Sequence, residues 1–283
     1  MTGKSINHVF LIDGSGFIFR AFYGLPPMTR PDGTPVNAVY GFTTMLMKMI
    51  EDTDADHVGV IFDKARRTFR NDIYPDYKAN RDEAPEDLIP QFDLVRRATK
   101  ALNVAAVDMD GFEADDLIAT YARLAREASA EVTIVSSDKD LMQLVGDGVA
   151  MYDAMKNRQI GPDEVFEKFG VGPDKVVDVQ ALAGDSTDNV PGVPGIGVKT
   201  AALLIREYGD LDSLLERAGE IKQPKRRQAL IDQADGARVS RDLVRLRDDV
   251  DVEAPISSFA HAAPEPQVLL AFLKEQAFRS LAA

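Results

Sequence analysis

Short apolar runs stand out from the polar background of the chain. The clearest are VFLI (9–12), VGVIF (58–62) and VTIV (132–135), and weaker ones lie at 104–107 and 149–152. The three clear runs are rich in β-branched or aromatic residues and lack polar alternation, as expected for strands that are covered on both faces. The pattern therefore predicts a buried sheet.

Between these runs, apolar residues recur at the spacing of a helix face. They are Val39, Phe42, Leu46, Met49 and Ile50 in one segment, and Leu117, Ile118, Tyr121 and Leu124 in another. Strands that alternate with helices predict an α/β fold with a largely parallel, twisted sheet flanked by helices.

The pattern changes near residue 170. Beyond it, helical segments are separated by Gly and Pro, and no convincing strand follows. We expect an α/β domain over 1–170 and a helical subdomain over 171–283. A final amphipathic stretch, VLLAFLKEQAFRSL, is followed by no polar tail, which is compatible with a piece of a longer protein.

Composition narrows the possible functions. The 283 residues are 45% hydrophobic and 28% charged, as in ordinary globular proteins, and include no cysteine. This excludes disulfides, thiolate metal sites and a cysteine nucleophile. The N-terminal apolar run is too short for a signal peptide core or a membrane span. We expect a cytoplasmic protein without a membrane partner, and by default a monomer.

The net charge of −13, from 46 acidic and 33 basic residues, argues against a nucleic-acid partner only if the acids are evenly spread. They are not, because each clear strand runs into aspartate. Asp13 follows the first strand, Asp63 the second, and Asp138 and Asp140 the third. Since parallel strands end at one edge of a sheet, where ligands bind, these four acids are expected to lie along that edge.

Two further motifs add acids. GFEADDL contributes Glu113, Asp115 and Asp116, and GDSTDN contributes Asp185 and Asp188. Any one of these acids is also compatible with a helix cap, a solvated turn or a helix start that complements the dipole. Together they favour a cation site, because clustered carboxylates repel one another unless hard divalent ions such as Mg²⁺ or Mn²⁺ neutralise them. Two such ions about 4 Å apart are the usual clamp for phosphoryl chemistry.

Other catalytic sets lack support. The only histidines are His8, His57 and His261, so neither a zinc set nor a Ser-His-Asp triad is indicated. A haloacid-dehalogenase-type phosphatase would have Asp two residues after Asp13, where Ser15 stands.

Basic residues gather elsewhere. Segment 64–81 mixes bases with three aromatics, a composition that suits single-stranded or frayed nucleic acid, although a solvated helix face would also explain it. The bases are Lys64, Arg66, Arg67, Arg70, Lys78 and Arg81, and the aromatics are Phe69, Tyr74 and Tyr77. A further basic run, KQPKRRQ (222–228), is equally compatible with duplex contact and with a solvated turn.

The stretch VPGVPGIGVKTAALLI (190–205) predicts glycine-rich turns and then a helix from about Val198. Glycines permit close backbone approach, and a helix N-terminus attracts an anion. This is a helix-hairpin-helix pattern, placed at 173–208, which grips duplex backbone without reading sequence. A purely structural tight turn is the alternative. The residues expected to contact DNA are Gly192, Gly195, Gly197, Lys199 and Thr200.

Taken in order, LIDGSGFIFRAF, VIFD, YKANR, GFEADD, SSDKDL and GDSTDNVPGVPGIGVKTA closely resemble the 5′-nuclease domains of bacterial DNA polymerases I, within the flap endonuclease family. The resemblance runs from about Val9 to the C-terminus. It implies one metal group of Asp13, Asp63, Glu113, Asp115 and Asp116, and a second of Asp138, Asp140, Asp185 and Asp188.

The resemblance also implies a helical arch over about 70–95, from which Lys78 and Arg81 reach the scissile phosphate. Arg20 and Arg70 would be further phosphate contacts, and Tyr77 a base-stacking or gating residue. A potassium ion would lie at the helix-hairpin-helix turn.

The function so implied is a Mg²⁺-dependent 5′→3′ exonuclease and flap endonuclease that acts on DNA with a 5′ flap, nick or frayed 5′ end, and on RNA primers, with two or more Mg²⁺ ions and Mn²⁺ as a substitute. Two alternatives are an RNA-cleaving nuclease, which would have no use for the duplex grip, and a non-catalytic junction-binding module, which would not need both acidic groups. Whether the chain is a stand-alone protein or an excised polymerase domain stays open.

Overall fold

The computed structural model describes residues 5–282, which fall into two compact units. Unit 1 contains the described residues up to Lys64, together with Glu83–Ser137 and those from Asp248 onward. Unit 2 contains Ala65–Asp82 and Asp138–Arg247. The units are interleaved along the sequence, so the tail of the expected second domain belongs to unit 1.

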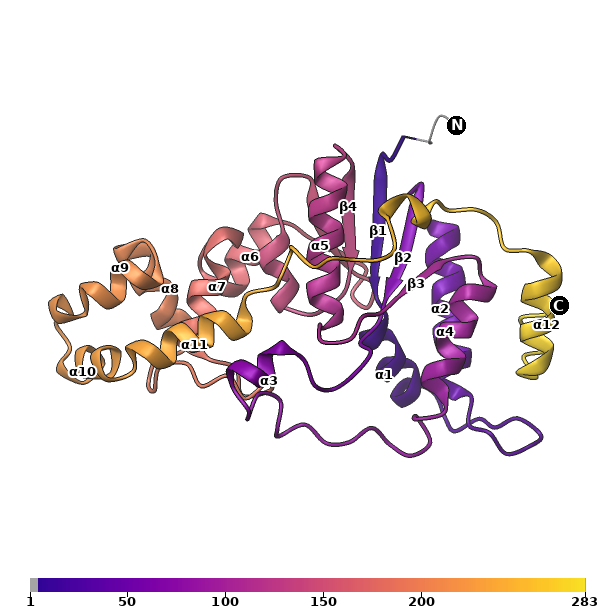
Figure 1. Cartoon of the computed structure of the whole chain (residues 1–283), viewed down its shortest axis with the longest axis horizontal. Helices are drawn as coiled ribbons and strands as arrows, with labels where there is room; N and C mark the ends of the chain where they lie inside the picture. The colour runs from indigo at the N-terminus through magenta and orange to yellow at the C-terminus, as the bar shows by residue number, and fades with distance from the viewer. Residues whose placement is uncertain (1–4, 283) are drawn as a thin grey trace. The chain divides into compact units, whose positions relative to one another are not determined.

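The sheet of unit 1 has four parallel strands in the order β3-β2-β1-β4 (Figure 1). They are β1 (His8–Asp13), β2 (His57–Ile61), β3 (Ala105–Val107) and β4 (Glu131–Val135). The apolar runs predicted all four, and β2 is buried along its whole length. The α/β prediction is therefore confirmed.

Helices of unit 1 cover this sheet, with α5 packed against β1, β2 and β4, and α1 against β2. The ring of Phe259 lies over Gly59 of β2, where a Cβ would come within 2.7 Å of it, which explains a glycine inside a buried strand. The helices are α1 (Gly14–Gly24), α2 (Asn37–Asp52), α4 (Gln91–Ala101), α5 (Ala114–Glu127), α12 (Pro266–Glu275) and the 3₁₀ helix η4 (Ile256–Phe259).

The parallel register brings the strand ends level. Asp13 at the end of β1 lies opposite Ile61 of β2, and Ile12 lies opposite Val135 of β4. The residues that follow each strand therefore emerge at the same edge, as predicted for ligand sites in parallel sheets.

At the opposite ends of β1 and β2, Asp56 joins the two strands. Its carboxylate accepts hydrogen bonds from the backbone N–H of His8 (2.9 Å) and Asn7 (3.1 Å). Burial acts to raise the pKa of Asp56, but these bonds and one with His57 outweigh it and lower the pKa to about 2.

Unit 2 is mostly helical but also contains a small antiparallel hairpin, β5 paired with β6. The apolar run predicted β5, whereas β6 was missed because two of its three residues, Arg158 and Gln159, are polar and exposed. The elements of unit 2 are α3 (Phe69–Ile73), η1 (Asp140–Leu144), β5 (Val149–Asp153), β6 (Arg158–Ile160), α6 (Pro162–Phe169), η2 (Pro173–Lys175), α7 (Val176–Ala183), α8 (Val198–Tyr208), α9 (Leu211–Glu216), η3 (Ala218–Glu220), α10 (Pro224–Asp232) and α11 (Ala234–Val244). Among residues 5–282, no helix is long and apolar enough to cross a membrane.

The helix-hairpin-helix consists of α7, a glycine-rich turn and α8, and α8 begins at Val198 as predicted. Gly184 ends α7 with φ +69°, and Gly192 has φ +61°. A Cβ on Gly192 would lie 2.4 Å from the backbone nitrogen of Gly184. The turn therefore needs glycine because two backbone segments touch there.

The segment expected to be a helical arch, 70–95, is helical only at its two ends. It begins within α3, which ends at Ile73, and helical structure resumes at Gln91 in α4. Between them lie turns and irregular segments containing Pro75, Pro85 and Pro90. Proline lacks an N–H and restricts the residue before it, so the expectation of a helix is wrong for residues 74–90.

Candidate active site

The first carboxylate group, comprising Asp13, Asp63, Glu113, Asp115 and Asp116, lies entirely in unit 1. Asp13 is buried at the end of β1 and accepts hydrogen bonds from the Ser136 hydroxyl (2.8 Å) and the Gly16 N–H (3.3 Å). Ser136 is placed there by the pairing of β1 with β4, which it directly follows. Strand register thus holds the Asp13 carboxylate in one orientation.

Asp63 follows β2 and contacts the start of α5. Its carboxylate accepts from the Ala114 N–H (2.8 Å) and from the Ser15 hydroxyl (2.7 Å). Since Ala114 is the residue after Glu113, these bonds connect two of the sequence motifs predicted to share a site.

The GFEADDL motif does start a helix, and its acids have different roles there. Asp116 is fully buried, and its carboxylate accepts from the N–H of Glu113 (3.1 Å) at the helix N-cap. Asp115, on the first turn of α5, is less buried. The helix-start interpretation therefore holds for Asp116 and also for Glu113, whose side chain accepts from the N–H of Asp116 in a reciprocal capping box.

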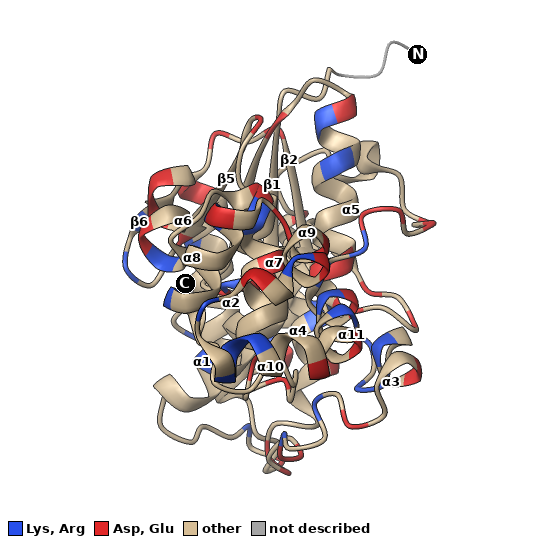
Figure 2. Cartoon of the chain, turned by 90° about the vertical axis from the view of Figure 1, so that its left-hand side faces the viewer, with Lys and Arg blue, Asp and Glu red and all other residues tan. Residues whose placement is uncertain are grey.

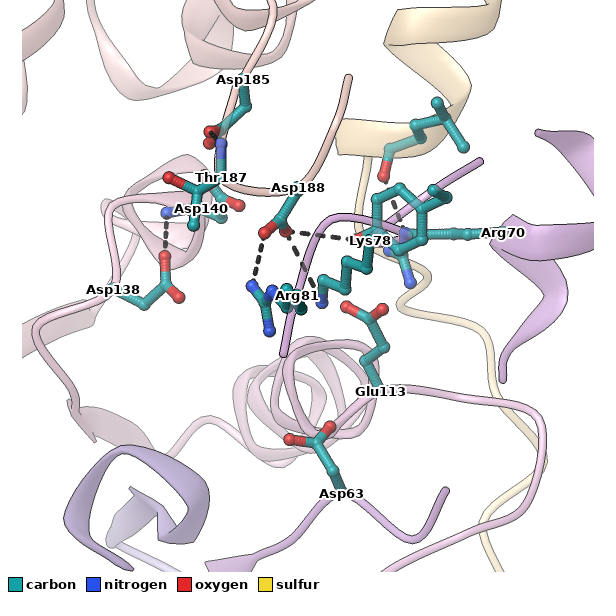
Figure 3. Close-up of polar contacts among 12 residues, drawn as sticks. Asp63, Arg70, Lys78, Arg81, Glu113, Asp138, Asp140, Asp185, Thr187 and Asp188 are labelled. Carbon is teal, nitrogen blue, oxygen red and sulfur yellow. Dashed lines mark hydrogen bonds and ion pairs between the residues drawn. The ribbon is translucent and has the colours of Figure 1, made fainter. Parts of the chain in front are cut away.

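The second carboxylate group, comprising Asp138, Asp140, Asp185 and Asp188, lies entirely in unit 2 (Figure 3). The N–H of Asp140 donates to Asp138 (2.9 Å), and the N–H of Thr187 donates to Asp185 (2.7 Å). Lys139 contacts both Asp140 and Asp185, so the two acidic motifs lie next to each other in this unit.

Basic side chains already pair with this group. Lys139 donates a hydrogen bond to Asp185, and its Nζ lies 3.4 Å from Asp140. Arg81 is paired with one oxygen of Asp188, and the Nζ of Lys78 lies 3.6 Å from the other (Figure 3). The two cations predicted to reach a phosphate therefore bind a predicted metal ligand in this structure.

Burial and the proximity of these charged groups shift the pKa values of Asp140, Asp185 and Lys139. Burial, followed by the charge of Asp138, raises the pKa of Asp140 to about 6. Burial also acts to raise the pKa of Asp185, but hydrogen bonds from Lys139 and the Thr187 N–H outweigh it and lower that pKa. Burial acts to lower the pKa of Lys139, but the charge of Asp140 and the bond to Asp185 raise it overall.

Gln180 of α7 is a further polar contact of the second group. Its side chain is 3% exposed, and its Nε2 donates to Asp140 at 2.5 Å. Within the described part of the chain, its Oε1 has no hydrogen-bond donor. An unsatisfied buried acceptor is costly, so this oxygen is suited to a further donor.

The chemistry of both groups fits a hard divalent cation. All nine side chains are carboxylates, and oxygen ligands are those that Mg²⁺ and Mn²⁺ prefer. Over residues 5–282, no three His, Asp or Glu side chains are arranged as a preformed metal cage. The carboxylates instead accept from the hydroxyl, amide and ammonium donors described above, some of which an ion would have to replace.

Arg70, which was expected to contact a phosphate, is buried in this structure. It is 1% exposed, and its guanidinium donates to the backbone carbonyls of Leu243 (2.7 Å) and Arg245 (3.2 Å). The side chain therefore cross-links α3 to the end of α11, and in this structure it is not accessible to a phosphate.

Tyr77 and Gly192 also differ from their predicted roles. Tyr77 is 5% exposed and lies with its hydroxyl 3.3 Å from Asp188, so it has no free ring face on which a base could stack. Gly192 is buried against Gly184 and therefore supports the turn from inside.

Other predicted DNA contacts are accessible. Gly195, Gly197 and Lys199 are exposed at the turn and the start of α8, and Thr200 is half-buried. Arg20 is exposed on α1. The run 222–228 leads into α10, on which basic residues are visible (Figure 2).

Sequence reasoning assigned no role to Ser15, Ser136, Lys139 and Gln180, all of which contact the acids. The position of Lys139 between Asp138 and Asp140 could have indicated its contact with the acids. Nothing in the sequence indicates the contact of Gln180, since it depends on how α7 packs.

Comparison with known proteins agrees with this architecture. The family model described as "5'-3' exonuclease, N-terminal resolvase-like domain" matches residues 8–170, and that described as "5'-3' exonuclease, C-terminal SAM fold" matches residues 171–267. T5 5'-exonuclease with bound zinc has the same fold, with a TM-score of 0.75 at 22% identity over 96% of this chain and 99% of that one.

Relatives of two kinds are similar in sequence. DNA polymerase I of Rhizobium leguminosarum is 56% identical over 98% of this chain, which spans only 28% of that protein. The 5'-3' exonuclease of Aquifex aeolicus is 35% identical over 96% of this chain and 93% of its own length. With both family models matched in order and a relative matched along nearly its whole length, the chain belongs to the 5′-3′ exonuclease family of nucleases.

Proposed function

We propose that this chain is a Mg²⁺-dependent, structure-specific nuclease that hydrolyses DNA from 5′ ends and at 5′ flaps, and also removes RNA primers from DNA. Each carboxylate group is proposed to hold one divalent ion, with Mn²⁺ able to replace Mg²⁺. The observation that carries this proposal is the pair of all-carboxylate groups, one per unit, in a chain of the 5′-3′ exonuclease family.

The residues of the first group fit that task because their orientation is set by the backbone. Ser136 and the Gly16 N–H hold Asp13, while the Ala114 N–H holds Asp63, which leaves carboxylate lone pairs for an ion. A bound divalent ion would activate water and neutralise charge that develops on the phosphate oxygens.

Lys78 and Arg81 are proposed to bind the scissile phosphate. Both are paired with Asp188, and Arg81 is about half exposed, with a side-chain exposure of 47%. A phosphate group can compete for such pairs, because it offers anionic oxygens in the geometry that Arg and Lys bind. Their positive charge would then stabilise the transition state.

The helix-hairpin-helix is proposed to hold the duplex. The exposed Gly195 and Gly197 let a phosphate approach the backbone, and Lys199 follows at the first turn of α8. A potassium ion held by carbonyls of this turn is part of the same proposal, as is a contribution from Arg20.

The relatives suggest a setting. This chain spans about a third or less of the DNA polymerase I relatives, so a tether to polymerase domains is proposed. We further propose that the nuclease is a cytoplasmic monomer that acts in replication and repair.

The test is cleavage of an end-labelled 5′-flap DNA with and without Mg²⁺. We compare the parent with Asp115→Ala and Lys78→Ala, and use Glu216→Ala, an exposed acid on α9, as the control. We expect Mg²⁺-dependent cleavage near the junction, a loss of about 100-fold or more in the first two variants, and no loss in the control.

Duplex binding, measured in parallel with Ca²⁺ present, should be largely kept in all variants. Cleavage that persists in Asp115→Ala would contradict a metal role for the first group. Binding without any cleavage by the parent would instead support the junction-binding alternative.

A further inference from the structure

The second carboxylate group contains a cation that belongs to the protein. Lys139 lies between two of its acids, hydrogen-bonded to Asp185 and 3.4 Å from Asp140. All three residues belong to unit 2, so the arrangement is internal to one compact unit. The ammonium group therefore occupies oxygens that a divalent ion would need.

The charges of this cluster are nearly balanced without any metal. Four carboxylates face three cations, because Arg81 and Lys78 pair with Asp188 while Lys139 serves Asp140 and Asp185. A divalent ion that entered this cluster would meet not only ligands but also a positive charge within a few ångströms, and the two would repel.

A second observation points to a hydrated ion at the same place. Gln180 is almost fully buried and directs its amide at Asp140, yet its Oε1 has no donor in the described part of the chain. Water bound to a metal ion is a strong donor, and outer-sphere acceptors of this kind orient the ligands of metal sites. The Oε1 of Gln180 is therefore positioned to accept a hydrogen bond that the Lys139 ammonium group does not supply.

We propose that Lys139 is a built-in counter-ion of the second carboxylate group, which a divalent ion must displace to bind Asp140 and Asp185, while Gln180 accepts a hydrogen bond from water that the ion carries. This inference rests on the proposed function, since it concerns the same metal group. Lys139 can leave without disturbing the fold, because its side chain is 37% exposed on a flexible four-carbon stem.

If a divalent ion must displace Lys139, removing this lysine should improve metal binding. A merely structural lysine would have the opposite effect, since its loss would disorder the acids. In the absence of metal, Lys139→Met should be less stable than the parent, because it leaves Asp185 without its cation.

The experiment is titration with Mn²⁺ at neutral pH, followed by electron paramagnetic resonance of the free ion. Lys139→Met should bind Mn²⁺ at least about tenfold more tightly than the parent at one site, since even screened charges of this size repel appreciably at close range. Lys156→Met is the matched control, because Lys156 also pairs with an aspartate of unit 2, Asp153 at 3.7 Å, away from this group. It should bind like the parent.

Two further variants locate the gain. Lys139→Arg keeps the charge and should retain the parent affinity, whereas adding Asp185→Asn to Lys139→Met should abolish the improvement. Unchanged or weaker Mn²⁺ binding by Lys139→Met would overturn the inference, even if the parent cleaves flap DNA with Mg²⁺. A parent that cleaves without any divalent ion would overturn the proposed function itself, whatever the Mn²⁺ titrations show.

Discussion

The turn of the helix-hairpin-helix permits a sharp test, because it contains two glycines with positive φ in different surroundings. Gly192 has φ +61°, and a Cβ there would lie 2.4 Å from the nitrogen of Gly184 and 2.7 Å from the carbonyl carbon of Ala183. Gly195 has φ +81°, but a Cβ there would meet no atom within 4 Å. Alanine at either position therefore shares the backbone strain, and only Gly192→Ala adds a collision.

The magnitudes follow from these two terms. An L-residue in the left-handed region costs about 1–2 kcal/mol, and reduced freedom of the unfolded chain returns about 0.4–1 kcal/mol. Gly195→Ala should therefore lower the free energy of unfolding by about 1 kcal/mol or less. At Gly192 the methyl group overlaps backbone that cannot rotate away, which adds about 1–3 kcal/mol and gives a total of about 1–4 kcal/mol.

The assay is urea unfolding followed by far-ultraviolet circular dichroism, since the chain contains no tryptophan for fluorescence. Equal destabilisation by the two substitutions would refute the reasoning, because it would mean that the close approach of Gly184 and Gly192 does not exist. Duplex affinity provides an independent readout: Gly195→Ala places a methyl group on the exposed turn and should weaken binding while stability changes little.

Further predictions concern buried contacts, pH and metal. Arg70→Met should lower the free energy of unfolding by about 3 kcal/mol, because it removes the donor from the buried carbonyl of Leu243 and from the partly buried carbonyl of Arg245, whereas Arg20→Met on an exposed helix face should not; equal thermal stability of the two variants would contradict the structural role of Arg70. Asp56→Asn should cost about 1 kcal/mol at neutral pH after solvent screening is allowed for, while the exposed Asp54→Asn should cost nothing. Because the folded pKa of Asp56 is lowered to about 2 from 3.8, its contribution is present above pH 3.8 and lost as the pH falls toward 2; a parent–variant difference that stays constant over this range would be inconsistent with that shift. Mg²⁺ at 100 times its dissociation constant should increase the free energy of unfolding of the parent by about 2.7 kcal/mol and so raise its melting temperature. An unchanged melting temperature would contradict the claim that cations offset the carboxylate crowding.

Local pattern was sufficient for the four parallel strands and for the position of the acids that directly follow them. Runs such as 9–12 and 58–62 are apolar throughout because both faces of the strand are covered, and that requirement is written in consecutive residues. Parallel pairing then places Asp13 and Asp63 at one edge, since parallel strands end at the same side of the sheet. The turn before Val198 was predictable for a similar reason, because its glycines and prolines restrict the backbone locally.

Local pattern failed where long side chains choose among distant partners. Arg70 and Tyr77 stand in a basic, aromatic segment that suits nucleic acid, yet packing buries both of them, Arg70 on the carbonyl of Leu243 and Tyr77 beside Asp188. Composition could not show this, because burial is a property of the folded surface and not of the segment.

The partners of the acids were likewise decided by tertiary structure. The sequence by itself determined that nine of the acidic residues stand in five motifs at the ends of strands or the starts of helices and turns. Only the fold decided that Lys139 meets Asp185, 46 residues away, and that Gln180 meets Asp140, 40 residues away. Hydrogen bonds and ion pairs act over a few ångströms, so they depend on how α7 and the loops of unit 2 pack, which no spacing along the chain records.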